Sequence, residues 1–428
     1  MIDKKYSLDY LALIIFVLYM LTVSLYISIF DSFVIQVLIL VFSLFLFILN
    51  KTMKNIKYSK KRIDKFWILS ILAILGSLHS SNFIIADIAP ALIFVLIIII
   101  YFYLREYKKG LMIILKIIRW AGVFYALSVF LSFFYPNLYN LFFLRFLRYV
   151  TISRIELLIS NGYYTGFTSD PAYVAGYLVF GIGALYCSWR YYQRKHAIVS
   201  LLLMFIALLL TQKRAHVVFL LISLMFIYLM FNKQDYVKII KYVKMISLIT
   251  AVAMLLFFIG INTKTGQVLF YRFIGTIDNF RLGEDISSGR ISLYLHAWDL
   301  FIDSPLYGIG WGNYEKTVIG ALGVKTEMKT HNIYLQILSE TGIIGFLGIF
   351  TPILITFIST IKTVKNAMKE LIVLNQEQFV LLKFSFFIQI FFLLYGLTGN
   401  LLTDFIFLTI YFISISIYYS LLNNRYYN

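Results

Sequence analysis

Residues 197–231 read AIVSLLLMFIALLLTQKRAHVVFLLISLMFIYLMF, two apolar runs separated by a short polar segment that contains Arg214. A single helix over this stretch would be about 52 Å long, whereas the hydrocarbon core of a bilayer is about 30 Å thick. The basic segments on either side, 189–196 and 232–244, are expected to share the cytoplasmic face of a membrane. The stretch therefore predicts two short transmembrane helices joined by a tight outer hairpin with Arg214 at its tip.

Similar apolar runs recur along all 428 residues, of which 61% are hydrophobic. They predict one all-α transmembrane domain over 1–428 with about twelve spans and no separate soluble domain. The first run is expected to be retained as a signal anchor. The predicted spans are 10–30, 33–49, 66–85, 87–104, 111–134, 171–188, 197–211, 216–231, 245–261, 333–357, 379–397 and 404–421.

The net charge of +18 follows the predicted topology. In this scheme 26 of the 38 Lys and Arg residues lie in or next to cytoplasmic segments, and the other 12 are matched by 12 acidic residues. This asymmetry predicts that both termini are cytoplasmic, and it argues against nucleic acid as the partner of the basic residues. The single cysteine, Cys187, lies in an apolar run, so no disulfide is expected.

Two outer segments are long enough to carry function. Residues 135–170 include 141–150, whose alternation of apolar residues and Arg suits a helix lying on the membrane. Residues 262–330 form a large extracytoplasmic loop between the ninth and tenth spans, rich in aromatic residues. In it, 291–301 has helical periodicity and ends at Asp303-Ser304-Pro305, and a glycine-rich turn follows at 308–313.

Four arginines on the outer side are candidates for gripping phosphate, because a planar guanidinium donates two parallel hydrogen bonds. They are Arg214, Arg272, Arg281 and Arg290. A cation held below the outer lipid surface is costly and is a candidate for function by default, although Arg214 could instead anchor to lipid phosphates. The other three could be ordinary surface residues. Arg290 is expected beside Arg214 if the loop folds back.

Three further residues on the outer side could take part in chemistry. His331 opens the helix after the large loop, where an imidazole could act as a general base or simply lie at the interface. Glu340 lies about 13 Å further along that helix, as a functional carboxylate or as the partner of a buried amide or cation. Asp170 precedes Pro171 and is expected to cap the next helix.

The chain contains no phosphate-cradling Gly-x-x-x-x-Gly-Lys-Ser/Thr, no Asp-x-Asp pair on a cytoplasmic loop and no His/Cys metal cluster. ATP-driven transport and a soluble nucleotide-sugar site therefore find no support. No metal or other cofactor is expected.

The segment HNIYLQILSETGIIG, residues 331–345, resembles the His-Asn-x-Tyr-Leu…Glu-x-Gly-x-x-Gly signature of the O-antigen polymerase and ligase family. Residues 290–314 resemble its Arg…Trp…Asp-x-Pro-x-x-Gly-x-Gly segment, and 212–215 its Ser-Arg-Gly-Ala turn, with Lys213 in place of Ser and Ala215 in place of Gly. Residues 166–171 are similar to another element, although Asp170 stands where Asn or Glu is often found. The resemblance covers 166–345.

This resemblance implies a GT-C-like helical fold and inverting glycosyl transfer at the outer face of a bacterial cytoplasmic membrane. The donor would be an oligosaccharide on undecaprenyl pyrophosphate. It implies that Arg214 and Arg290 stabilise the leaving pyrophosphate and that His331 is the base. Substrate-binding residues would be Arg272, Arg281, Asp170, Asn332 and Glu340.

Three functions stay open on the sequence. The first is a Wzy-type polymerase of capsular, exo- or O-polysaccharide, working with a flippase and a chain-length regulator. The second is a ligase that moves the glycan to a lipid, protein or wall acceptor. The third is a lipid-linked sugar flippase or transporter, for which essential charges are expected at the midplane of the helices and not in the outer loop.

Overall fold

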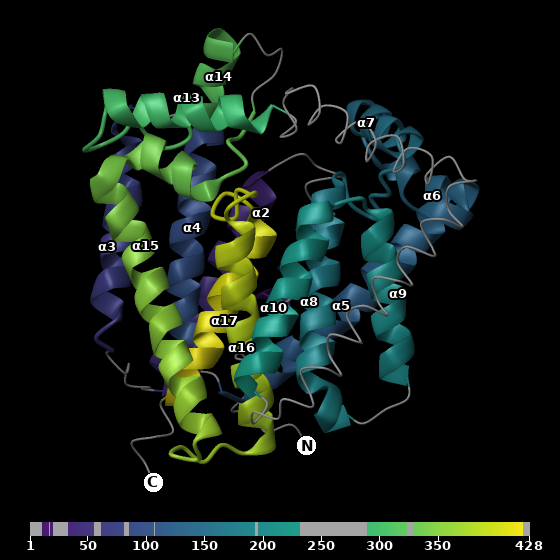
Figure 1. Cartoon of the computed structure of the whole chain (residues 1–428), viewed down its shortest axis with the longest axis vertical. Coiled ribbons are helices and arrows are strands. Elements are labelled where there is room, and N and C mark those ends of the chain that lie inside the picture. The colour runs from purple at the N-terminus through teal and green to yellow at the C-terminus, as the bar shows by residue number, and fades with distance from the viewer. Residues whose placement is uncertain are drawn as a thin grey trace.

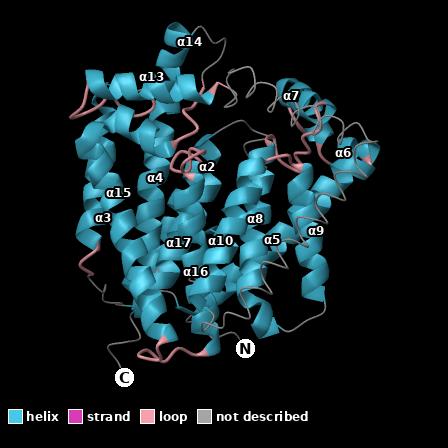
Figure 2. Ribbon diagram, in the orientation of Figure 1, coloured by secondary structure: helices cyan, strands magenta, loops and turns pink. Residues whose placement is uncertain are grey.

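The computed structural model describes residues 11–16, 18–19, 33–54, 61–80, 85–106, 108–192, 196–231, 289–322 and 328–422. Within these ranges the regular structure is entirely helical (Figures 1 and 2). The longer helices are α2 (Phe33–Lys54), α3 (Asp64–Gly76), α4 (Ile85–Leu104), α5 (Lys108–Phe134), α8 (Pro171–Tyr192), α9 (His196–Leu210), α10 (Arg214–Phe231), α15 (Ile333–Met368), α16 (Gln376–Tyr395) and α17 (Phe405–Leu422). They run roughly side by side as a bundle (Figure 1).

A second set of helices covers one end of this bundle. These are α6 (Pro136–Phe142), the 3-10 turn η3 (Leu144–Phe146), α7 (Tyr149–Ser160), α13 (Arg290–Asp303) and α14 (Tyr314–Leu322). Helix α13 lies across the ends of the long helices, above α15 and α4 (Figure 1).

Six described helices are long and apolar enough to cross a membrane: 110–134, 171–189, 214–231, 333–368, 376–395 and 405–422. Three shorter apolar helices, 37–49, 90–104 and 196–210, accompany them. The protein is thus a helical, multi-pass membrane protein. Most of the predicted span 10–30 and all of 245–261 lie outside the described residues, so the count of about twelve stays a prediction.

The predicted hairpin at Arg214 is confirmed as two helices. Helix α9 ends at Leu210, a turn of three residues follows, and α10 begins at Arg214. The helix predicted around 291–301 is confirmed as α13.

Two predicted helices differ from the structure. The predicted span 66–85 is interrupted, because α3 ends at Gly76 and a 3-10 turn follows. There the carbonyl of Ser77 accepts a hydrogen bond from the amide of Trp311, 2.9 Å away. A single helix over 141–150 is wrong as well: Leu147 is extended and separates η3 from α7.

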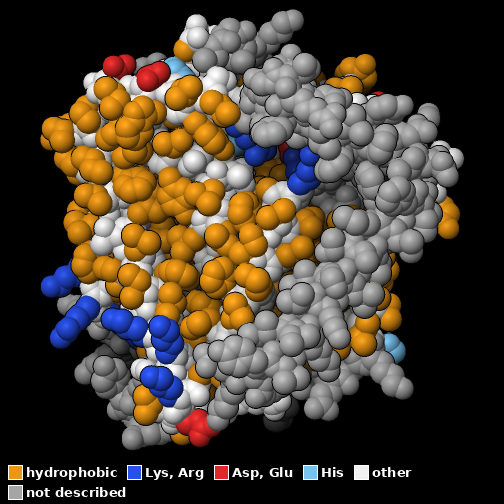
Figure 3. Space-filling view, viewed as in Figure 1, with side chains coloured by type: hydrophobic (Ala, Val, Ile, Leu, Met, Phe, Trp, Pro, Cys, Tyr) orange, Lys and Arg blue, Asp and Glu red, His pale blue; other side chains and the backbone are white. Residues whose placement is uncertain are grey.

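Apolar and aromatic side chains fill the centre of the bundle, where α17 is almost completely buried. Where α5 crosses α8, Gly122 and Gly181 meet so closely that a Cβ on either would lie 2.7 Å from the other's Cα. Small residues allow such close packing of helices in membranes. On the face shown in Figure 3, an apolar belt crosses the middle of the bundle, and Lys and Arg side chains gather at its lower edge.

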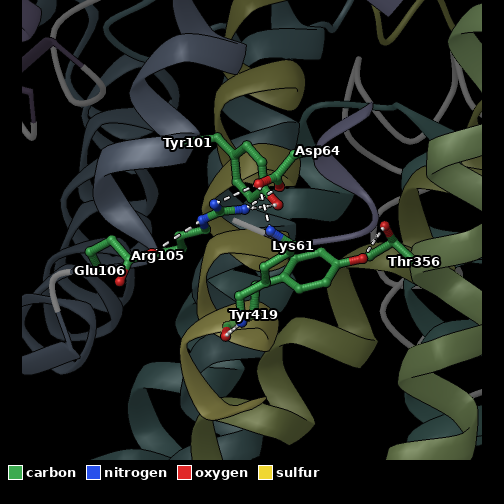
Figure 4. A network of polar contacts seen from close by, with 7 residues as sticks. All are labelled: Lys61, Asp64, Tyr101, Arg105, Glu106, Thr356 and Tyr419. Carbon is green, nitrogen blue, oxygen red and sulfur yellow. Dashed lines mark hydrogen bonds and ion pairs between the residues drawn. The ribbon is translucent and has the colours of Figure 1, made fainter. Parts of the chain in front are cut away.

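A buried ion pair holds the lower end of the bundle together (Figure 4). Arg105, whose side chain is 0% exposed, contacts both carboxylate oxygens of Asp64, at 2.5 and 3.0 Å. Lys61 donates to the backbone carbonyl of Tyr419 at 3.0 Å, and the hydroxyl of Tyr419 lies 3.1 Å from Thr356. These bonds connect α4 and the start of α3 with α17 and α15, at the end of the bundle opposite α13.

Candidate functional site

The helical backbone of α15 is interrupted near its start at Gly342. This glycine has φ 62° and ψ −172°, and a Cβ there would lie 2.3 Å from the carbonyl carbon of Leu306. The amides of Ile343 and Ile344 do not complete the helix. They donate to the carbonyls of Pro305 and Leu306, at 2.8 and 3.3 Å. Residues 305–306 thus enter the break in α15.

The glycine-rich turn pairs with the other side of the same break. The amide of Ile309 donates to the carbonyl of Ser339 at 3.0 Å, and the amide of Gly310 to that of Glu340 at 2.8 Å. A Cβ on Gly308 would lie 2.4 Å from the carbonyl carbon of Glu340, so the backbones approach too closely for a larger residue. Two motifs distant in the sequence are therefore joined backbone to backbone.

Glu340 lies inside this junction and is 0% exposed. Its carboxylate accepts a hydrogen bond from the side-chain amide of Gln336 at 3.2 Å. The backbone amides of Gly312 and Tyr314 also act on the carboxylate. Of the two interpretations of Glu340, the structure shows the partner of a buried amide, which ties the glycine-rich turn to α15.

His331 has a left-handed backbone, with φ 55°, which is uncommon for a residue other than glycine. Its two neighbours stabilise this conformation. The hydroxyl of Thr330 donates to the carbonyl of Asn332 at 2.8 Å and accepts from the amide of Asn332 at 3.1 Å. The side chain of Asn332 accepts from the amides of Tyr334 and Leu335 and so caps α15.

Two other elements hold His331 from outside its own segment. The amide of Ile333 donates to the carbonyls of Gly396 and Gly399, at 3.0 and 3.1 Å. The hydroxyl of Tyr294, on α13, lies 3.3 Å from the carbonyl of His331 and 3.4 Å from that of Leu397. His331 therefore lies where α13, α15 and the α16–α17 loop meet.

Positive charge surrounds the half-buried imidazole of His331. Burial lowers its pKa to about 4, and Arg290, Lys213 and Lys329 lower it in the same direction, while Asp170 opposes them. Arg290 is the first residue of α13, one turn before Tyr294, so both residues belong to the same face of that helix. The structure thus places Arg290 and Asp170 among the charged groups that act on His331.

Asp170 connects three elements at the edge of this site. Its carboxylate is 2.9 Å from the guanidinium of Arg154 on α7 and 3.7 Å from the ammonium of Lys213 in the α9–α10 turn. It also accepts a hydrogen bond from the amide of Ala172 at 2.8 Å, which confirms the predicted cap of α8.

Arg214 lies differently from its neighbour Lys213. Arg214 is exposed at the first position of α10, and it is not among the charges that act on His331. Lys213, one residue earlier, pairs with Asp170 and acts on the imidazole. On this face Lys and Arg side chains lie in a hollow below α13 (Figure 3). Arg272 and Arg281 lie outside the described residues.

Asp404 is a further carboxylate near the site that sequence reasoning missed. It accepts hydrogen bonds from the amides of Ile406 and Phe407 and caps α17. Burial raises its pKa to about 7, against the effects of Lys329 and the two amides. Lys329 in turn lies 3.2 Å from the hydroxyl of Thr403. Because Asp404 precedes a strongly apolar run, its sequence context suggests only a cap.

Among the described residues, no group of three or more His, Cys, Asp or Glu side chains is placed to hold a metal ion. The polar groups gathered around His331 are cations, carboxylates and hydroxyls. Such a set can bind an anion and can transfer a proton at the imidazole.

The fold and the site together define a multi-pass membrane protein with a cluster of charged residues around His331 at one end of its helices. Residues 199–350 match the family model described as O-antigen ligase. This segment, about a third of the chain, is therefore similar to the O-antigen ligases and polymerases, whose members are membrane enzymes of glycan transfer. The matched segment contains Lys213, Arg290, His331 and Glu340. No curated protein matches the chain.

Proposed function

We propose that this protein is an inverting glycosyltransferase that polymerises oligosaccharide repeat units carried on undecaprenyl pyrophosphate. It would act at the outer face of the bacterial cytoplasmic membrane, with both termini inside. The observation that carries the proposal is the position of His331, whose imidazole is under the electrostatic influence of Arg290, Lys213 and Lys329, within a segment that matches the O-antigen ligase family model.

The cations supply what the leaving group needs. As the anomeric bond breaks, its electron pair goes to the diphosphate oxygen, and the added negative charge is stabilised by preorganised donors. Arg290 can bind phosphate oxygens with a planar fork, and Lys213 and Lys329 can add compact charges. Stabilisation of the leaving diphosphate by the exposed Arg214 remains a prediction, as do the substrate-binding roles of Arg272 and Arg281.

His331 is suited to accept the proton of the attacking hydroxyl. The acceptor oxygen forms the new glycosidic bond on the face opposite the departing diphosphate, and its proton passes to the imidazole. A base with a pKa of about 4 is neutral at pH 7 but weak. Because a bound diphosphate offsets the neighbouring cations, it raises the pKa of His331. The base thus becomes stronger when the donor is in place.

A ligase is the second candidate, favoured by the description of the matching family model. The donor half of the reaction would be identical, and only the acceptor would differ. The product separates the two functions: a polymerase yields a longer lipid-linked glycan, whereas a ligase yields a glycan joined to another lipid, a protein or the wall.

The transporter alternative expects charge at the midplane of the bundle. The described charged clusters lie instead at its two ends, around Asp170 and His331 at one and around Asp64 and Arg105 at the other. This placement supports a transferase.

The test is to replace Arg290 and His331 by alanine in cells that make the glycan. Both variants should insert normally and stop chain growth, so that lipid-linked single repeat units accumulate while the flippase and the chain-length regulator remain present. Lys316→Ala, on the exposed surface of α14, serves as the control and should leave polymer length unchanged. Full-length polymer from both site variants would refute the proposed roles.

A further inference from the structure

The segment between α5 and α8 forms a distinct arm at the end of the bundle that carries the candidate site. Helices α6 and α7 lie beside the ends of α5, α8 and α9 (Figure 1). A small core holds the arm together, formed by Tyr139, Phe143, Leu144, Leu147 and Ile155. We call residues 135–160 the α6–α7 arm.

The outer surface of the α6–α7 arm is strongly apolar. Tyr149, Val150 and Leu157 are 83%, 79% and 64% exposed. The other exposed large apolar residues of the arm are Tyr135, Leu138, Leu141, Phe142 and Phe146. Soluble surfaces rarely expose so many large apolar side chains in one continuous segment. The exposed apolar surface continues onto Phe134 at the end of α5, a helix that is long and apolar enough to span the membrane.

The charges of the arm are mainly positive. Residues 135–160 contain three arginines and one acidic residue, Glu156. Arg145 and Arg148 are exposed, and the guanidinium of Arg145 lies 4.8 Å from the ring centre of Phe146. Arginine binds phosphate well, and aromatic side chains favour the level of the lipid headgroups. Apolar residues together with basic ones are typical of helices that lie in the membrane interface.

The arm is also firmly joined to the candidate site. The hydroxyl of Tyr139 donates to the carbonyl of Gly166 at 2.7 Å and lies 3.1 Å from the hydroxyl of Thr165. Arg154 pairs with Asp170 at 2.9 Å. The depth at which the arm lies in the membrane therefore bears directly on the depth of the site's charges.

We propose that the α6–α7 arm lies in the outer leaflet and binds anionic phospholipid headgroups through Arg145 and Arg148, which holds the cationic site at the level of the lipid phosphates. This inference does not depend on the reaction that the site performs. Anionic phospholipid is inferred as the occupant of this surface for two reasons. The apolar surface is continuous with the membrane-facing end of α5, and two guanidinium groups are exposed on it.

The test uses the full chain in lipid nanodiscs, with Cys187→Ser as the background so that a single new cysteine can carry a fluorophore. The labelled positions are Leu157→Cys on the arm and Lys316→Cys on α14 as the exposed control at the same end. Quenching by lipids with a doxyl group near the headgroup is compared with quenching by aqueous iodide. The label at Leu157 should be quenched several times more strongly by lipid than by iodide, and the label at Lys316 the reverse.

Headgroup preference is tested with doxyl-labelled phosphatidylglycerol and phosphatidylcholine at equal amounts. Phosphatidylglycerol should quench the Leu157 label more strongly, and the double variant Arg145→Gln, Arg148→Gln should abolish the difference. Equal quenching by the two lipids in the unsubstituted arm would overturn the headgroup site. If iodide quenched the Leu157 label as strongly as the Lys316 label, the proposal that the arm inserts into the membrane would be overturned. Insertion would also be overturned if neither quencher reached the Leu157 label and this protection disappeared on dilution in detergent. Such a result would indicate that a second copy of the chain covers the arm.

Discussion

The hydroxyl of Tyr294 lies 3.3 Å from the backbone carbonyl of His331, which has a left-handed conformation. Tyr294 is one helical turn from Arg290, so a single face of α13 both provides a cation and supports the backbone of the imidazole. The hydroxyl of Tyr294 contacts the backbone carbonyl of His331 and not its imidazole. Tyr294 is therefore a positioning residue for His331.

Tyr294→Phe removes only this hydroxyl and should lower kcat by roughly fivefold to tenfold with little change in KM, because about 1 kcal/mol of positioning is lost. Steady-state turnover of a lipid-linked donor measures the effect. Tyr307→Phe is the matched control, since Tyr307 is 64% exposed at the other end of the same loop region. An equal loss in both variants would show that Tyr294 has no special role.

The environment of His331 predicts its protonation behaviour. Burial and the neighbouring cations disfavour the imidazolium, so the pKa is lowered to about 4 and the ring stays neutral through mildly acidic pH. The rate of carbethoxylation of His331, followed by mass spectrometry of its peptide, should therefore change little between pH 7.5 and 5.5. An ordinary histidine with a pKa of about 6.5 would lose most of its reactivity over this range.

Replacing the cations should weaken this effect without removing the larger effect of burial. Arg290→Gln and Lys213→Gln each remove a positive charge that disfavours the imidazolium, so both should raise the pKa of His331, and the loss of its modification on acidification should begin at a higher pH than in the unsubstituted protein. A pH profile identical to that of the unsubstituted protein in both variants would contradict the proposed cluster.

Lys213 and Asp170 should affect anion binding in opposite directions. Lys213→Ala should weaken the binding of inorganic pyrophosphate, measured by calorimetry in nanodiscs, by roughly tenfold for a lost charged contact. Asp170→Asn should tighten it, because the competing carboxylate charge is removed while the side-chain oxygen that caps α8 is kept. A purely structural ion pair predicts no such opposition.

Arg214→Ala is the matched neighbour in the same experiment. The exposed position of Arg214 predicts a smaller loss of pyrophosphate binding than Lys213→Ala causes. The opposite ranking would favour the assignment drawn from the family motif over the one drawn from the structure.

Gly342→Ala should destabilise the junction that supports the site. Its φ of 62° and the 2.3 Å approach to Leu306 leave no space for a Cβ, and strain of this kind costs about 1–3 kcal/mol. Thermal unfolding in detergent should show a lower Tm than in Gly320→Ala, where nothing lies within 4 Å of the added Cβ. Equal Tm values would show that the break in α15 is not needed for stability.

The sequence predicts most of the described fold because apolar length and basic loops are direct consequences of the bilayer. The hairpin at Arg214 is confirmed for this reason, and helix α13 is confirmed because its apolar residues recur at helical spacing. The break at Gly342 could not be predicted in the same way. It depends on hydrogen bonds from Ile343 and Ile344 to residues nearly forty positions earlier. The periodicity of apolar residues does not indicate contacts between such distant backbone groups.

The site was only partly predictable. Arg290 and Asp170 both act on the imidazole of His331, whereas Arg214, expected beside Arg290, is exposed and is not among the charges that act on it. Lys213 was not singled out, because the direction in which two adjacent side chains point is decided by the turn after α9 and by the pairing with Asp170. Asn332 and Glu340, expected to bind substrate, have structural partners that only the folded chain shows. Their binding roles stay predictions.

The central proposal, glycosyl transfer with His331 as the base, is tested most directly with purified protein in nanodiscs and a lipid-diphosphate-linked glycan, with products analysed by mass spectrometry. The unsubstituted protein should release lipid diphosphate and form a longer or transferred glycan with inverted configuration. His331→Ala should bind inorganic pyrophosphate normally yet form product at a rate lower by about 10²–10⁴. Product formation by His331→Ala at the unsubstituted rate would contradict the role of this imidazole.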